Sequence, residues 1–132
     1  MFKLIKIENG RQNIPEPEYL EVAASEAVSL GEALSLASGK LTKCSPTTAP
    51  AYIAMGEVTA TTAKRIIAAC RVEPNQVYEV ECSAAPSALV VGDKVTITSD
   101  ALGVTATTAS GVAKVVALNG ASIAGDKITV RF

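Results

Sequence analysis

The chain repeats one short pattern of apolar and polar residues three times. Each copy has a glycine, an acidic residue and a variable residue, followed by an aliphatic, a hydroxyl and a second aliphatic residue. The copies are Gly31-Glu32-Ala33-Leu34-Ser35-Leu36, Gly92-Asp93-Lys94-Val95-Thr96-Ile97 and Gly125-Asp126-Lys127-Ile128-Thr129-Val130. The alternation predicts a half-buried strand, and the glycine predicts a tight turn with positive φ. The acid is expected to bond the backbone of the turn. We therefore interpret five residues as structural turn residues: Gly31, Gly92, Asp93, Gly125 and Asp126.

Two of these copies lie in longer matching stretches, at an offset of 61 residues from Gly31 to Gly92. The stretches cover residues 28–42 and 89–105, and each leads to a further apolar segment, at 51–55 and at 111–115. One interpretation is an internal pseudo-repeat. The other is a chance likeness between strand-turn-strand segments, and the sequence leaves both open.

The rest of the chain continues the same β pattern, with turn signals every eight to twelve residues or so. Strands are expected at about 19–22, 33–36, 40–44, 51–57, 65–72, 77–82, 94–98, 102–106, 112–118 and 127–131. The predicted fold is all-β: a compact, partly closed β-barrel or sandwich of short hairpins over residues 19–132, with an extended N-terminal arm over residues 1–18.

The arm prediction depends on residues 1–18. Apolar and basic residues mix at its start, and Pro15 and Pro17 then remove backbone donors that a central strand would need. An extended arm can add a strand to the edge of a partner. The candidate partner-binding residues are Phe2, Lys3, Leu4, Lys6 and Arg11. The alternatives are a plain N-terminal tail, or an ordinary strand in which Phe2, Leu4 and Ile7 pair within their own domain.

Composition narrows the possible functions. The chain has 132 residues, 48% hydrophobic but only 4% aromatic, so an aliphatic core is expected. A net charge of −1 without a basic run speaks against a nucleic-acid partner. No apolar run reaches the roughly 18 residues of a membrane span, so no membrane partner is expected. The N-terminus lacks the pattern of a signal peptide, which favours a cytoplasmic site of synthesis.

Candidate chemistry is sparse. The chain has no histidine, which excludes Ser-His-Asp and Cys-His nucleophiles, and it has no glycine-rich phosphate motif. We expect no enzyme, no catalytic residue, no cofactor and no metal site. Cys44, Cys70 and Cys82 are interpreted as small apolar fillers, with Cys44 partly exposed at the end of a strand.

Two charged groups have alternative interpretations. Glu79 and Glu81 share one face of a predicted strand, which is ordinary for a solvated sheet surface but is also the spacing of an acidic pair. Lys64, Arg65 and Arg71 fit a solvent-facing edge, and they would also fit a contact to an acidic protein surface. In both cases the plainer interpretation is favoured.

Several longer segments carry a family resemblance. They are the Pro-Glu-Pro strap, "SLGEALSLASGKLTKC", "PAYIAMGEVTATTAKRIIAACRV", "ALVVGDKVTITSDALGVTATTASGVAKVVA" and the terminal "AGDKITVRF". Over about residues 19–132 the chain resembles the capsid decoration, or capsid-stabilising, proteins of tailed phages and prophages. This group is distantly similar to the lambda head decoration protein.

The resemblance implies a non-enzymatic virion structural protein that decorates and stabilises the capsid. Its partners would be the major capsid protein and further copies of itself, as a homotrimer. It would lie on the capsid surface after assembly in the host bacterial cytoplasm. Candidate contacts between copies are Ile66, Val112 and Val116. A phage head–tail joining or tail-tube subunit is the alternative, and a small cytosolic binding domain is a third possibility.

Overall fold

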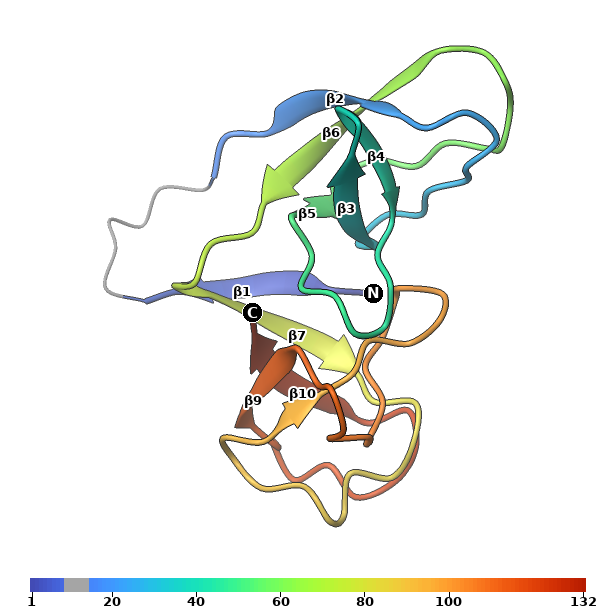
Figure 1. Cartoon of the computed structure of the whole chain (residues 1–132). Helices are drawn as coiled ribbons and strands as arrows, with labels where there is room; N and C mark the ends of the chain where they lie inside the picture. Colours follow the sequence, from blue (N-terminus) through green and yellow to red (C-terminus); the bar gives the residue numbers. More distant parts are fainter. Residues whose placement is uncertain (9–14) are drawn as a thin grey trace.

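The computed structural model describes residues 1–8 and 15–132, and these residues form ten strands and no helix (Figure 1). None of them therefore belongs to a helix that could cross a membrane. The all-β prediction is confirmed. The strands are β1 (Lys3–Ile7), β2 (Glu18–Val22), β3 (Ala33–Ala37), β4 (Lys40–Lys43), β5 (Tyr52–Ala54), β6 (Arg65–Arg71), β7 (Gln76–Glu81), β8 (Lys94–Val95), β9 (Ala113–Ala117) and β10 (Lys127–Arg131).

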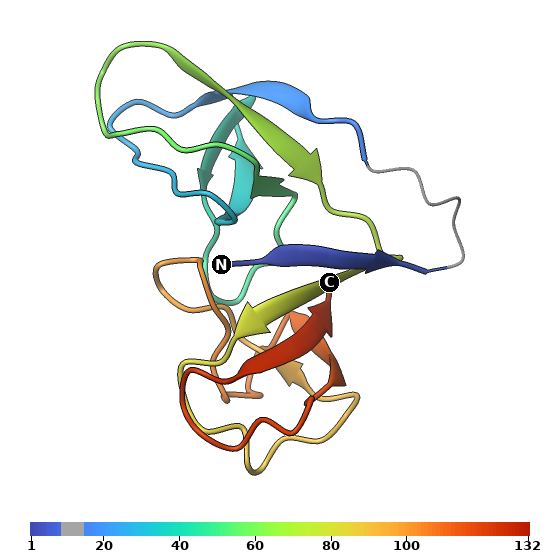
Figure 2. The ribbon, with the colours of Figure 1, turned by 180° about the vertical axis from the view of Figure 1, so that it is seen from behind.

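The strands form a closed barrel and a separate open sheet. The barrel has the order β2-β4-β3-β5-β6, and the sheet has the order β1-β7-β10-β9-β8. In both ribbon views the barrel lies at one end of the molecule and the sheet at the other (Figures 1 and 2). The predicted barrel is present, and it is formed by β2 to β6 alone. Because the chain leaves the barrel after β6, its second half builds a sheet of its own, and β1 joins that sheet.

Two apolar cores hold these layers together. The barrel interior contains Val22, Leu34, Leu41 and Ile67, each at most 5% exposed. The second core joins the inner face of the sheet to residues on the outside of the barrel, which are Ala33, Cys44 and Ile53. Burying an aliphatic side chain of this size is worth about 1.5–3 kcal/mol. The sheet is therefore attached to the outer wall of the barrel by an aliphatic core.

The three Gly-acid phrases make identical backbone contacts. In each, the glycine N–H donates to the carbonyl of a residue in an adjacent strand or, for Cys82, directly after one. The N–H of that residue then donates back to the carbonyl of the acid. The pairs are Gly31 with Ala54 (2.9 Å) and Ala54 with Glu32 (2.9 Å), Gly92 with Val115 (2.9 Å) and Val115 with Asp93 (2.8 Å), and Gly125 with Cys82 (2.8 Å) and Cys82 with Asp126 (2.9 Å). Each phrase therefore fixes the register between its own strand and the neighbouring one, and it does so in the same way in all three places.

The strand pairing preserves the 61-residue offset seen in the sequence. Ala33 faces Ile53 across β3 and β5, and Lys94 faces Lys114 across β8 and β9. Both members of the first pair are displaced by the same number of residues in the second. The pseudo-repeat interpretation is supported by this pairing, although the first copy lies in the barrel and the second in the sheet.

One predicted strand, at residues 102–106, is absent. Ala101 has a φ of 57° and donates its N–H to the carbonyl of Thr98 (2.9 Å), which folds the chain into a tight turn. Val104 then makes only isolated bridges, one to Cys82 and one to Ile97. The apolar alternation there reflects burial, because Val104 is fully buried.

The arm prediction is wrong over residues 2–7. β1 pairs antiparallel with β7, and Phe2 is only 3% exposed. The Phe2 N–H also donates to the carbonyl of Gly31 (2.9 Å), which links the start of β1 to the first Gly-acid turn. This matches the alternative in which the segment is an ordinary terminal strand. Arg11 lies outside the described residues.

Three of the chain's few aromatic rings meet where β1 crosses between sheet and barrel. The ring of Phe2 lies 5.4 Å from that of Phe132 and 6.4 Å from that of Tyr78, between centroids. Tyr78 and Phe132 are 5.8 Å apart. Such tilted and edge-to-face pairs add about 0.5–1.5 kcal/mol beyond their buried area. Phe2 therefore packs as a core residue at the junction.

We predict that Phe2→Ala lowers the free energy of unfolding by about 3–5 kcal/mol, because it empties a buried aromatic site. The matched control is Lys6→Ala in the same strand. It removes an exposed side chain whose ion pair with Glu8 (3.3 Å) is worth at most about 1 kcal/mol. Urea unfolding followed by circular dichroism measures both. If both variants lost the same small amount of unfolding free energy, residues 2–7 would instead be an arm that does not pack into the fold.

Candidate interaction surface

β1 is an edge strand: β7 pairs with one of its sides, and no strand of residues 1–8 and 15–132 pairs with the other. Lys3, Ile5 and Lys6 are exposed along it, and Leu4 is half-buried. Of the five predicted partner-binding residues, Phe2 is thus buried, Lys3 and Lys6 are accessible, Leu4 is partly accessible, and Arg11 is not described. A partner-binding role for the accessible residues stays a prediction.

An apolar groove of about 470 Å³ runs beside β1. We call it the β1 groove. Lys3 is the charged residue in its lining, which otherwise consists of apolar and uncharged polar side chains. The lining residues are Met1, Phe2, Lys3, Leu4, Pro15, Leu30, Gly31, Ile53, Ala54, Met55, Cys70 and Tyr78. It therefore lies between the first strand of the sheet and the β5–β6 wall of the barrel.

The outer wall of the barrel continues the apolar surface of this groove. The Met55 N–H donates to the carbonyl of Ala68 (2.9 Å), and Ala68 faces Tyr19 across β6 and β2. Ile66 lies two residues from Ala68 and so shares its face. The exposed fractions are 43% for Met55, 56% for Ile66 and 72% for Tyr19. We call Tyr19, Met55, Ile66 and Ala68 the barrel face.

Only one member of the barrel face, Ile66, was predicted as a contact from the sequence. The other two predicted contact residues, Val112 and Val116, are half-buried and lie at or beside β9 in the sheet. The structure therefore does not bring the three together. Tyr19 and Met55 were missed because alternation shows that a strand has two faces, but not which face is left uncovered.

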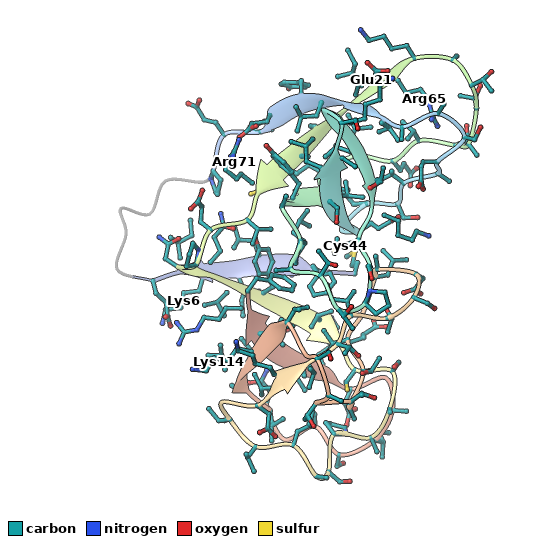
Figure 3. The ribbon with its side chains drawn as sticks, viewed as in Figure 1. Lys6, Glu21, Cys44, Arg65, Arg71 and Lys114 are labelled. Carbon is teal, nitrogen blue, oxygen red and sulfur yellow. The ribbon has the colours of Figure 1, made fainter. Side chains whose placement is uncertain are left out.

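Arg65 and Arg71, at opposite ends of β6, bind within the chain (Figure 3). The Arg65 guanidinium donates to the carbonyls of Glu26 (2.6 Å) and Ala23 (2.7 Å), and also to that of Thr59. It thus ties together the loops at one end of the barrel. These contacts account for Arg65 without an acidic partner.

Arg71 closes the other end of the same wall. Its Nε donates to Glu18 Oε1 (2.7 Å), and its guanidinium lies 5.2 Å from the ring centre of Tyr52. The Tyr52 hydroxyl donates to the other oxygen of Glu18 (2.9 Å). The hydrogen bonds from Arg71, and then from Tyr52, lower the pKa of Glu18. This cluster fastens β2 to β5 and β6.

The predicted chemical groups are placed in structural roles. Cys44, Cys70 and Cys82 are all buried, and burial raises the pKa of each thiol, which suppresses the reactive thiolate. The expectation that Cys44 is partly exposed is wrong, because that side chain packs where the barrel meets the sheet. Glu79 pairs with Lys127 (3.1 Å) on the outside of the sheet. Residues 1–8 and 15–132 hold no cluster of three or more Cys, Asp and Glu suited to a metal ion.

The turn residues share one local geometry. Gly31, Gly92 and Gly125 have φ values of 74°, 103° and 90°. In each turn the acid accepts the N–H of the residue three positions earlier. The bonds run from Ser29 to Glu32 (2.8 Å), from Val90 to Asp93 (2.9 Å) and from Ile123 to Asp126 (3.0 Å). The acid thus caps the turn that the glycine makes possible.

The acids differ in their surroundings. The N–H groups of Ile123 and Ser122 lower the pKa of Asp126, which is solvated. Glu32 is only 2% exposed, and burial raises its pKa despite the bond from Ser29. Within the described part of the chain its Oε1 accepts no hydrogen bond, and Lys43 Nζ lies 3.9 Å away.

Comparison with known proteins finds similarity at the level of structure. No family model and no curated protein matches the chain. Among solved structures, its fold is similar to that of the head fiber gp8.5 N base of bacteriophage phi29, with a TM-score of 0.57. The match covers 88% of this chain and 93% of that one, at 16% sequence identity. At this identity the likeness establishes a shared fold.

The glycines provide a graded stability prediction. A Cβ on Gly92 meets nothing within 4 Å, so Gly92→Ala should cost only the positive φ, about 1–2 kcal/mol. A Cβ on Gly31 would lie 2.8 Å from Met1 Cβ and 3.0 Å from the Phe2 carbonyl oxygen, so Gly31→Ala should cost about 1–3 kcal/mol more. Denaturant unfolding measures both variants. Equal losses would mean that β1 does not press on the first turn.

Glu32 provides a pH prediction. Its folded pKa lies above the unfolded value, so its contribution to stability is greatest when it is protonated and falls as pH rises through the folded pKa. The free energy of unfolding of the wild type should therefore decline relative to Glu32→Gln as pH rises above the ordinary glutamate pKa of 4.5 and through the raised folded pKa. Parallel unfolding curves at several pH values measure this difference. A difference that stays constant with pH would contradict it.

Proposed function

We propose that this protein is a non-enzymatic structural subunit of a tailed-phage or prophage head. In this role it binds the outside of the capsid shell, with the major capsid protein as its partner and further copies of itself beside it as a trimer. The observation that carries the proposal is the fold shared with a phage head fiber base over 88% of the chain. The sequence resemblance to capsid decoration proteins supports the same class independently.

The mechanism is mechanical. A shell filled with DNA is under internal pressure, and it fails first where neighbouring capsomers are weakly joined. A bound subunit adds contact area at such places, about 1,600 Å² for an interface of standard size. Many copies on one shell add avidity. The aliphatic cores and the turn-locked strands suit a part that bears load and does no chemistry.

The loops at the end of the sheet away from the barrel supply a contact for the shell. Val90, Val91 and Ile123 are 62%, 63% and 64% exposed, and their loops run along that end in both ribbon views (Figures 1 and 2). Val90 and Ile123 are held at Gly-acid turns, so their apolar side chains are presented on a short, bonded backbone. These residues replace the buried Phe2 as the proposed apolar contact to the capsid.

The test is to locate the protein on particles. The gene is tagged in the bacterium that carries it, and released particles are labelled with gold against the tag and viewed by electron microscopy. The proposal predicts label over the surface of the heads, and less label for Ile123→Lys, in which a charge replaces an exposed aliphatic. Label along tails or at the neck would favour the joining or tail-tube alternative. Particles without label would overturn a virion role.

A further inference from the structure

The largest exposed apolar side chains fall into two main groups. One group consists of Val90, Val91 and Ile123 on the loops of the sheet. The other lies across the middle of the molecule, on the barrel face and along the β1 groove. It contains Met1, Leu30, Met55, Ile66 and Tyr19, exposed by 54%, 50%, 43%, 56% and 72%. The second group is the one for which nothing described so far provides a partner.

We infer that the barrel face and the β1 groove together form the contact between neighbouring copies of this chain. This contact rests on the proposed function, which places several copies together on one shell. The surface is continuous. Leu30, Met1 and Met55 share the groove, Met55 is bonded to Ala68, and Ala68 leads to Tyr19 and Ile66.

The area of the surface fits a second copy. At about 200 Å² for a large side chain, the five exposed fractions amount to roughly 500 Å² of apolar surface. A monomer's largest apolar patch is usually about 300–600 Å². One side of a standard interface buries about 800 Å², of which somewhat over half is apolar. The group is therefore large for a surface that faces only water, and it is enough for the apolar part of one subunit interface.

Charged side chains border the surface. Lys3 lines the β1 groove, and Glu21 faces Ile66 across β2 and β6, where it pairs with Lys40 (2.7 Å). The four residues of the barrel face themselves carry no charge. A second copy covers this apolar centre, and the charged side chains stay at its solvated rim.

The barrel also makes this surface rigid. The Arg71–Glu18–Tyr52 cluster and the Arg65 bonds hold β2 and β6 at both ends, so the barrel face is already ordered before a partner arrives. Preordered side chains lose less entropy on binding, which favours association. Arg65 and Arg71 thus support the barrel face through bonds within the chain.

The experiment compares one substitution at two exposed isoleucines. Ile66→Lys places a charge in the barrel face, and Ile123→Lys is the matched control on a sheet loop, with exposures of 56% and 64%. Sedimentation velocity of the purified full chain, at about 1 to 100 μM, measures the assembly. The wild type and Ile123→Lys should associate, and Ile66→Lys should associate at least about tenfold more weakly.

Circular dichroism and the thermal midpoint check that the variants fold, and Tyr19→Lys serves as a second barrel-face variant if Ile66→Lys does not. A wild type that stays monomeric, or equal effects of Ile66→Lys and Ile123→Lys, would overturn the contact. If Ile66→Lys instead removes label from heads while the wild type alone is a monomer, the barrel face binds the capsid protein. Because sedimentation needs no capsid, its failure is separate from failure of the proposed function.

Discussion

The paired backbone hydrogen bonds beside each Gly-acid turn are the constraint on which this structure depends. A strand of two to five residues has too few ladder bonds to fix its own register, and a slip by one residue would reverse its apolar face. Here the glycine N–H donates to a carbonyl beside it in, or directly after, a neighbouring strand, and the N–H of that same residue donates to the carbonyl of the acid that follows the glycine. Gly92 and Asp93 are bonded to Val115 in this way. Three such pairs of hydrogen bonds set the registers of β3, β8 and β10. These registers in turn decide which side chains enter the two cores.

The first strand, β1, connects the barrel to the sheet. Its Phe2 N–H is bonded to the first of the locked turns, and the Phe2 ring lies against Tyr78 and Phe132 of the sheet. No strand in the described part of the chain pairs with the outer side of β1, and β1 forms one wall of the β1 groove. The residues that join barrel and sheet therefore also shape the surface proposed to meet a second copy. Under this proposal, the strand that joins the two cores also contributes to the contact between copies.

Much of the fold could be predicted because its rules are local. The turn at Gly31 and the strands after it follow from the conformational freedom of glycine and from the period of two. The position of Phe2 could not be predicted, because alternation fits a strand paired with a partner as well as one paired with β7. Ile53 lies in β5 and Met55 directly follows that strand, two residues along the chain, yet Ile53 is buried in the core shared with the sheet and Met55 is 43% exposed. That difference depends on tertiary packing, which local periodicity does not contain.

Native-state amide hydrogen exchange, followed residue by residue by NMR, tests the central claim most directly. It reports the free energy needed to open each bond. The N–H groups of Gly31, Gly92 and Gly125 should be as well protected as those of the central strand β7, although each lies in a turn. The returning N–H groups of Ala54, Val115 and Cys82 should match them. Exchange of the three glycine amides at the rate of exposed loops would show that the turns do not hold the strands in register.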